Sequence, residues 1–443
     1  MNFLRATMHE VDEDVIRVLS SPGLDKTREE QEDAMEFLKK NHYIVENYRE
    51  DEALLEDLYR KESATWRKIA VCIAIPSYDC QLKCVYCFRR LRSDIKNDSQ
   101  TRKLPIDLFC AALDKLFDQE GIMSSQLSLT GGEPLLPKNE EIISSILHEA
   151  AKRKMNLLSI TTNGVDMDTY LPLLKKYRIP VKVSLDGPQR IHDKRRIRRD
   201  GSGTFQSIVQ NIEEARKHIN IVLKFNADSQ NIKYLPEFAD FVVSRGWHED
   251  KHFSFVVSTI KFVSSEYPYF LKWYDMLEKL MELHRKFPST RLFNFYNTFT
   301  NFFDSWLKLS ASRKFETRDN LLSVNCCYTP YGFVFDPEGI IYSCTVLQHE
   351  IGRYSPTFEL YGEERQRMRD RNVATIEQCR RCKYGLLCGS GCAYEASQTT
   401  GSFENPMCPL PRDTMDSWVN SYLRFLYEMR GTWREGIPHE RHE

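Results

Sequence analysis

The stretch between about residues 66 and 259 most constrains the fold, because short apolar runs alternate there with longer amphipathic runs. The apolar runs predict strands at residues 69–75, 126–129, 157–162, 181–185, 221–227 and 252–258. The longer runs predict helices at residues 105–119, 139–154, 168–177, 204–218 and 232–245. Strands that are separated by helices predict an α/β fold with a parallel sheet and right-handed crossovers. In parallel barrels the chemistry lies on the loops that leave the carboxyl ends of the strands.

Composition narrows the class of protein. The chain has 443 residues, enough for two or three domains, and its 62 Lys and Arg nearly balance its 63 Asp and Glu. We therefore expect no nucleic-acid partner. Apolar runs are too short to cross a membrane, and the first ten residues lack the pattern of a secretion signal. We expect a soluble, cytoplasmic protein whose clustered cysteines bind metal rather than form disulfides. Of its 13 cysteines, Cys72 and Cys110 stand apart from the clusters and are expected to be small buried apolar residues.

Two loops at predicted strand ends carry chemistry. Cys80, Cys84 and Cys87 follow the first strand with C-x3-C-x2-C spacing, and such thiolates suit an iron–sulfur cluster or zinc. Three ligands hold three irons of a cubane and leave the fourth iron open to another molecule. Gly131-Gly132-Glu133-Pro134 follows the second strand. Its glycines allow a close approach to a ligand and its carboxylate can accept from an ammonium group, although the stretch alone could be an ordinary turn.

With an aromatic residue, Tyr86, before the last cysteine, this loop resembles the signature of the radical S-adenosylmethionine (SAM) enzymes. The resemblance implies a partial (β/α)6 TIM-like barrel in which Cys80, Cys84 and Cys87 hold a [4Fe–4S] cluster. It also implies that the open iron binds the amine and carboxylate of SAM. Reductive cleavage of SAM then gives a 5′-deoxyadenosyl radical that abstracts a substrate hydrogen.

The resemblance also implies contacts to the cosubstrate. The run from Ser184 to Phe205 resembles a loop of the peptide- and sulfatase-maturing branch of the family. By position, Ser184 and Arg196 would contact SAM, with Arg196 on its carboxylate, and Tyr86 would lie against the adenine. The rest of the basic run at 194–199 is most simply a solvated loop. The complete set of implied cosubstrate residues is Tyr86, Gly131, Gly132, Glu133, Pro134, Asn163, Ser184 and Arg196.

A second group of cysteines lies near the carboxyl end of the chain: Cys326, Cys327, Cys344, Cys379, Cys382, Cys388, Cys392 and Cys408. A zinc ribbon is the alternative, but this number of thiols fits one tetrahedral zinc poorly. The pattern resembles the SPASM extension, which carries two auxiliary [4Fe–4S] clusters. The resemblance assigns the distal cluster to Cys379, Cys382, Cys388 and Cys408. It assigns the other to Cys344, Cys392 and one or both of Cys326 and Cys327. Because adjacent cysteines reach one cluster only with strain, an open iron that binds a substrate thiolate is our hypothesis there.

These observations predict five segments. They are an N-terminal cap or peptide-recognition-like module at 1–66, the radical SAM partial barrel at 67–260, a helical bridge at 261–320, a SPASM domain at 321–412, and a C-terminal helix and tail at 413–443. A strand predicted at 41–45 would let the first module capture a leader peptide by strand addition.

The resemblance implies a maturase that forms a thioether or carbon–carbon crosslink in a ribosomally synthesised precursor peptide. Its electron would come from a reducing partner such as flavodoxin or ferredoxin. The alternatives are a small-molecule dehydrogenase or decarboxylase, a zinc-bearing scaffold, and a sulfatase-maturase-like enzyme. The last is disfavoured, because Thr345 stands where those maturases have an aspartate. No catalytic base is predicted, although Asp336 and Glu338 are candidates.

Overall fold

The computed structural model describes residues 15, 29–44, 47–91, 102–261, 266–295, 332–408, 410 and 412–429. The chain forms two compact, discontinuous units. The first comprises Met1–Thr65, Thr298–Cys327 and Arg369–Cys408, and the second comprises Trp66–Asn297, Tyr328–Met368 and Pro409–Glu443. The five consecutive segments predicted from the sequence remain a prediction. No helix in the described part of the chain is long and apolar enough to span a membrane.

The second unit is built on one sheet, and the six strands predicted from the sequence form its centre. They are β1 (Ile69–Ala74), β2 (Ser124–Leu129), β3 (Asn156–Thr162), β4 (Val181–Ser184), β5 (Ile221–Ala227) and β6 (Phe253–Thr259). Each pairs in parallel with the next in chain order. The predicted α/β fold with a parallel, partial-barrel core is therefore confirmed.

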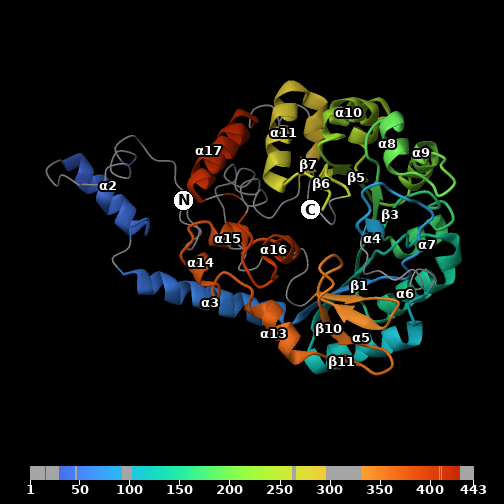
Figure 1. Cartoon of the computed structure of the whole chain (residues 1–443), viewed down its shortest axis with the longest axis horizontal. Helices are drawn as coiled ribbons and strands as arrows, with labels where there is room; N and C mark the ends of the chain where they lie inside the picture. The colour runs from blue at the N-terminus through green and yellow to red at the C-terminus, as the bar shows by residue number, and fades with distance from the viewer. Residues whose placement is uncertain are drawn as a thin grey trace. The chain divides into compact units, whose positions relative to one another are not determined.

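Helices cover the outer face of these strands (Figure 1). They are α5 (Ile106–Glu120), α6 (Glu140–Lys152), α7 (Leu171–Tyr177), α8 (Gln189–Arg195), α9 (Phe205–Ala215), α10 (Leu235–Ser244) and α11 (Trp273–Lys286). Each long helix turns an apolar stripe to the sheet. Phe225 of β5 and Phe238 of α10 are both fully buried, with ring centroids 5.8 Å apart. The face of β5 that carries Phe225 is therefore the helix-covered face, and the opposite face of the strand lines the barrel interior.

The sheet continues beyond the six predicted strands. Among the described residues its order is β11-β10-β9-β8-β1-β2-β3-β4-β5-β6-β7. β7 (Phe293–Phe295) pairs in parallel with β6, and β8 (Gly332–Phe335) pairs in parallel with the free edge of β1. β9 (Ile340–Tyr342), β10 (Glu350–Arg353) and β11 (Glu359–Leu360) then add antiparallel strands. The sequence analysis did not predict this extension. The unit ends with α17 (Arg412–Met429).

The first unit holds α2 (Glu29–Lys40), most of α3 (Tyr48–Trp66) and the short helices α14 (Glu377–Arg380), α15 (Gly385–Cys388) and α16 (Ala393–Thr400). The strand predicted at 41–45 is wrong for residues 41–44, which form a turn; residue 45 lies outside the described part. The N–H groups of Asn41 and Tyr43 donate to the carbonyls of Phe37 and Leu38, at 3.0 and 2.8 Å. The last turn of α2 therefore uses the groups that a sheet ladder would need.

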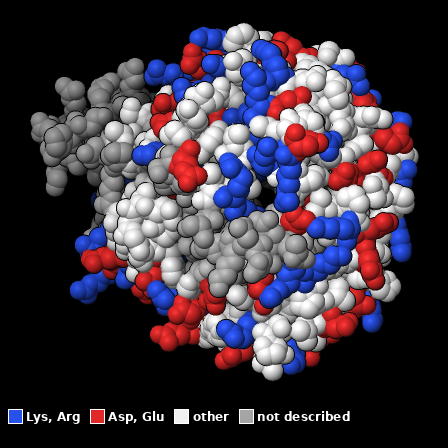
Figure 2. Space-filling model, turned by 45° about the vertical axis from the view of Figure 1, so that its right-hand side comes forward, with Lys and Arg blue, Asp and Glu red and all other residues white. Residues whose placement is uncertain are grey.

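Charged side chains of both signs are interspersed on the face drawn in Figure 2. This distribution agrees with the near balance of 62 basic and 63 acidic residues. This face offers no single-signed surface for a polyanion.

Candidate active site

The cysteine loop follows β1 and is held by the segment after α8. Lys83 N donates to Ile197 O at 2.8 Å, and Val85 N donates to Arg195 O at 3.0 Å. These bonds fix the backbone between Cys80 and Cys87. Cys84 is buried and the other two cysteines are partly buried. Leu82 N lies 3.4 Å from Cys80 Sγ, so a backbone donor is already aimed at that sulfur.

The three thiols fit an iron–sulfur cluster better than a single ion. Burial, with smaller contributions from Cys84 and Cys87, raises the pKa of Cys80 to about 12. The three sulfurs therefore share one electrostatic environment. Yet no group of three or more His, Cys, Asp or Glu in the described ranges is close enough to hold one metal ion. A cubane separates its ligands, because each cysteine binds a different iron. The three thiols are the right donors for a cluster, and its assignment to Cys80, Cys84 and Cys87 remains a prediction.

The glycines after β2 allow close contact with the cysteine loop. Gly132 N donates to Ser77 O at 3.1 Å, and Glu133 N donates to Asp79 O at 2.7 Å. A Cβ atom added at Gly132 would lie 2.2 Å from Asp79 O. The small size of Gly132 therefore brings two loop backbones together, and the predicted contact of these glycines with a ligand remains a prediction.

Glu133 points inward. Its carboxylate accepts from Leu135 N at 2.9 Å, Thr162 Oγ1 at 2.6 Å and Asn163 N at 2.6 Å. Burial outweighs these donors and raises the pKa of Glu133 to about 7. The carboxylate therefore ties the loop after β2 to the end of β3. Its predicted contact with an ammonium group remains a prediction, as does that of Pro134, whose carbonyl accepts from Asn139 at 3.1 Å.

Asn163, at the end of β3, reaches the cysteine loop. Its side-chain amide donates to Gln81 Oε1 at 3.1 Å and lies 3.9 Å from Cys80 Sγ. Hydrogen bonds to cluster sulfurs shift reduction potentials. The geometry thus gives Asn163 a place beside the cysteine sulfur, and its predicted contact with the cosubstrate remains a prediction.

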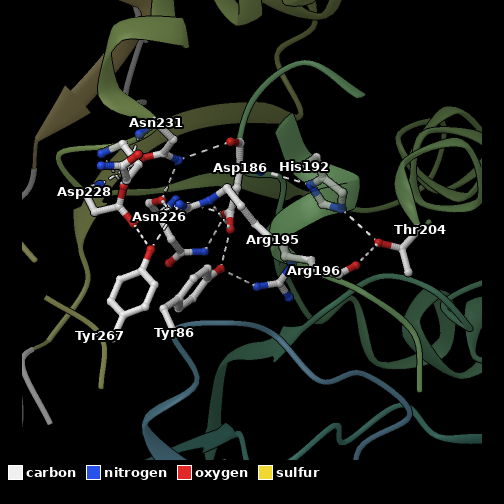
Figure 3. A network of polar contacts seen from close by, with 11 residues as sticks. Tyr86, Asp186, His192, Arg195, Arg196, Thr204, Asn226, Asp228, Asn231 and Tyr267 are labelled. Carbon is white, nitrogen blue, oxygen red and sulfur yellow. Dashed lines mark hydrogen bonds and ion pairs between the residues drawn. The ribbon is translucent and has the colours of Figure 1, made fainter. Parts of the chain in front are cut away.

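Tyr86 and Arg196 lie together in a buried polar network (Figure 3). Arg196 Nη1 donates to the Tyr86 hydroxyl at 2.7 Å, and this hydroxyl donates to the carboxylate of Asp186. Asp186 is fully buried and also accepts from Asn226 Nδ2 at 2.9 Å. Burial raises its pKa, but the charges of Arg196 and Arg195 outweigh that effect and hold the pKa below its ordinary value. Arg196 Nε makes no hydrogen bond within the described ranges and is free to donate to an anion.

Arg195 completes the network. Its Nη1 lies 2.8 Å from Asp228 Oδ2 and 3.2 Å from the hydroxyl of Tyr267, and its guanidinium lies 5.0 Å from the ring centroid of Tyr86. Arg195 is buried, so assigning it to a solvated loop was wrong. The reason is that Asp186 and Asp228 supply the counter-charges that a buried guanidinium needs.

A neutral histidine positions the backbone of Arg196. The N–H of Asp186 donates to His192 Nδ1 at 3.1 Å, so the ring proton lies on Nε2, which donates to Thr204 Oγ1 at 2.9 Å. That hydroxyl then donates to the carbonyl of Arg196 at 2.8 Å. Burial lowers the pKa of His192 to about 4. The sequence analysis gave no role to His192, which lies within the run from Ser184 to Phe205.

Ser184 is the last residue of β4 and is buried. Its register partner on β5 is Lys224, and its predicted contact with SAM remains a prediction. The sequence analysis missed the other members of the network, which are Asp186, Arg195, Asn226, Asp228, Asn231 and Tyr267. Asp186 and Tyr267 are 81 residues apart in the chain, and only the fold brings them into one network.

The first unit groups four of the later cysteines. Burial raises the pKa of Cys388 to about 12, and Cys379, Cys408 and Cys382 add to the increase in that order. Gln378 Nε2 donates to Cys408 Sγ at 3.1 Å. These four thiols are the ones predicted to hold the distal auxiliary cluster, and their grouping suits that assignment.

Arg371 stabilises the backbone around these four cysteines. Its buried guanidinium donates to the carbonyls of Phe403 at 2.5 Å, Gly391 at 2.8 Å and Ser390 at 2.9 Å. It therefore joins the segments that lead to Cys388, Cys392 and Cys408. Its positive charge also lowers the pKa of Cys388, against the larger effect of burial.

The ligand set predicted for the other auxiliary cluster is divided between the two units and the undescribed residues, and it remains a prediction. Cys392 lies in the first unit, at the start of α16, and Cys344 lies in the second unit after β9. Val346 N lies 3.4 Å from Cys344 Sγ. Cys326 and Cys327 lie outside the described residues, as does the hypothesis of an open iron there.

The two candidate proton acceptors have local structural contacts. Asp336 accepts from Tyr78 at 3.0 Å and from the N–H groups of Glu338 and Ile340 at 3.0 and 2.8 Å. Glu338 lies 2.5 Å from Arg102. Asp336 therefore stabilises the turn between β8 and β9, and Glu338 pairs that turn with Arg102; a proton-acceptor role for either carboxylate remains a prediction.

Comparison with known proteins gives a consistent result. The model of the Radical SAM superfamily matches residues 74–242. The Cysteine-type anaerobic sulfatase-maturating enzyme of Clostridium novyi is 25% identical over 374 residues, which cover 77% of this chain and 93% of that enzyme. The structure of native anSMEcpe with bound AdoMet has a TM-score of 0.58 at 19% identity and covers 83% of this chain and 100% of that chain. Streptococcus suis SuiB bound to precursor peptide SuiA has a TM-score of 0.50 at 16% identity, covering 90% and 93%. At these identities the structures share the fold.

Proposed function

Because the chain is a radical SAM enzyme, with its radical SAM domain at residues 74–242, we propose that it matures a ribosomally synthesised precursor peptide by forming a thioether or carbon–carbon crosslink. The cofactors would be SAM and three [4Fe–4S] clusters, with flavodoxin or ferredoxin as the reducing partner. When bound, these groups supply the abstraction of one hydrogen atom and the removal of one electron. Forming one crosslink removes two hydrogens from the peptide, the second leaving as a proton and that electron.

The match of residues 74–242 to the radical SAM family carries the proposal, and the mutual electrostatic influence of Cys379, Cys382, Cys388 and Cys408 supports it. A chain that only cleaves SAM needs the loop of Cys80 alone, whereas an oxidative crosslink needs a place for the remaining electron. A second group of thiolate donors could hold an auxiliary cluster, and that cluster would accept the remaining electron. In this assignment, Cys344, Cys392 and one or both of Cys326 and Cys327 hold the other auxiliary cluster.

The residues around Tyr86 have distinct parts in this proposal. Tyr86 would lie against the adenine, and Arg196 would donate its unpartnered Nε–H to the carboxylate of SAM. The hydroxyl of Ser184 and the backbone of Gly131 and Gly132 would complete the contacts. Asp186 keeps Arg196 charged and in place, since burial of an unpaired guanidinium would be costly.

A peptide substrate is supported by the relatives. The fold matches that of SuiB, which was solved with the precursor peptide SuiA. The chain also covers 93% of a sulfatase-maturating enzyme, whose name denotes action on a protein. Sulfatase maturation is therefore the second candidate, although Thr345 stands at the position where the maturases have an aspartate.

The test is the mass of a peptide encoded by a neighbouring gene, after anaerobic co-expression with this protein. The control is the Cys84→Ala variant, which removes one predicted cluster ligand. We expect a loss of two hydrogen masses for each crosslink, and no loss with the variant. Conversion of a peptide cysteine or serine to formylglycine would instead support the sulfatase-maturase candidate. An unchanged mass while SAM is still cleaved would refute the peptide as substrate.

A further inference from the structure

Lys224 lies on the interior face of the barrel. Its neighbours on β5, Leu223 and Phe225, are fully buried, and Phe225 packs against α10 on the helix-covered side of the sheet. Because successive side chains of a strand point to opposite faces, Lys224 projects toward the interior. Its register partner on β4 is Ser184, which is implied to contact SAM. Lys224 is therefore placed where a substrate could meet the cosubstrate.

The ammonium group of Lys224 has no hydrogen bond or ion pair within the described part of the chain. Burial lowers its pKa to about 8; Asp186 opposes this effect, whereas Lys182, Arg196 and Lys261 add to it. Asp186 already accepts from Tyr86 and from Asn226. The side chain is still partly accessible to solvent, so an incoming group can reach it. The interior thus has a basic group without a counter-ion of its own.

We propose that Lys224, reinforced by the charges of Lys182 and Lys261, binds a carboxylate of the substrate inside the barrel. A carboxylate would accept from the ammonium group and offset the positive charge of its surroundings. The inference rests on the proposed function in one respect: the carboxylate is taken to belong to a peptide. It is either an acidic side chain or the carboxyl terminus.

The test measures protection of lysines from acetylation in the anaerobically purified, cluster-containing protein. Three capped tripeptides serve as probes: acetyl-Ala-Glu-Ala-amide, its Gln counterpart with an amide end, and the Gln peptide with a free carboxyl terminus. Mass spectrometry compares Lys224 with Lys115, an exposed lysine on α5. We expect the Glu peptide or the free-acid peptide to reduce labelling of Lys224 at least threefold, while the fully neutral peptide and Lys115 show no change.

Equal protection by charged and neutral peptides, or protection by neither charged peptide, would overturn the proposal. So would protection by SAM alone with no further effect of a charged peptide, because the lysine would then serve the cosubstrate. Whichever charged peptide protects identifies the source of the carboxylate.

A Lys224→Gln variant, with Lys115→Gln as its control, provides a second measurement. We expect binding of the protective peptide, followed by NMR of the peptide, to weaken about tenfold only in Lys224→Gln. Unchanged binding would overturn the proposal. If protection is observed but no crosslink forms in the co-expression test, the carboxylate site stands and the proposed reaction fails. If a crosslink forms but no charged peptide protects Lys224, the proposed reaction stands and the carboxylate site fails.

Discussion

Replacing Asp186 by Asn tests whether the buried polar network stabilises the run from Ser184 to Phe205. The substitution keeps the size of the side chain but removes the charge that faces Arg195 and Arg196. Asp186 is fully buried, its Oδ2 lies 3.7 Å from Arg195 Nε, and its Oδ1 accepts from Asn226. Asp228 still lies 2.8 Å from Arg195 in this variant, but the buried Arg196 loses the carboxylate that offsets its charge. Leaving a buried charge without its partner costs about 3–5 kcal/mol.

The expected loss is large compared with the stability of a domain, which is about 5–15 kcal/mol. We expect the thermal midpoint of the cluster-containing protein to fall by roughly 6 °C or more, since 1 kcal/mol shifts a domain of this size class by about 2–4 °C. The matched control is Glu237→Gln, which removes a carboxylate from Arg190 on the exposed surface. Exposed pairs contribute little, so the midpoint of that variant should stay near the wild-type value.

Circular dichroism under anaerobic conditions measures both midpoints. Because the pKa of Asp186 lies below its ordinary value, the carboxylate is charged above that value, and its stabilising effect is lost only as pH falls through the lowered pKa. The deficit of Asp186→Asn should therefore be constant between pH 6 and 8. Equal midpoints for Asp186→Asn and Glu237→Gln would refute the reasoning.

Three further outcomes follow from the described contacts. Burial lowers the pKa of His192 from its usual 6.5 to about 4, so the unfolded chain binds a proton that the folded chain does not, and the free energy of unfolding falls as pH drops from 6.5 toward 4. In His192→Asn, about 3 kcal/mol of this pH dependence should be lost. If denaturant unfolding of the wild type and the variant has the same pH profile, the prediction is contradicted. Gly132→Ala should separate the loop after β2 from the cysteine loop, because the added Cβ would lie 2.2 Å from Asp79 O. The affinity for SAM, measured by equilibrium dialysis, should fall at least tenfold. An affinity equal to that of the wild type would show that the loops adjust. Arg371→Met leaves several carbonyls unpaired near Cys388 and should lower the iron content by about one cluster of three, whereas an unchanged iron content would show that Arg371 is dispensable.

The central strands could be predicted because their signal is local. Each of the six is a short apolar run between helical patterns, and the observed bounds differ from the predicted ones by at most two residues. β8 could not be found in this way. Gly332–Phe335 is a four-residue run whose partner, β1, is more than 250 residues away in the chain, and nothing local announces that pairing.

The candidate site likewise has parts that the local sequence predicts and parts that depend on the fold. The cysteine positions follow from spacing alone, because a short loop brings its own thiols together. Arg195 and Arg196 are neighbours in one basic run, yet both are buried, since Asp228 and Tyr86 reach them from other elements. The direction of Glu133 likewise depends on Thr162 of the next strand. Charge and burial at these positions are properties of the fold.

The most direct test of a radical maturase is the fate of the abstracted hydrogen. The peptide that the co-expression experiment identifies would be made fully deuterated at carbon and incubated with the reduced protein and SAM. We predict that the 5′-deoxyadenosine isolated from this reaction carries one deuterium and that the peptide is crosslinked. Unlabelled 5′-deoxyadenosine beside an unchanged peptide would contradict the account.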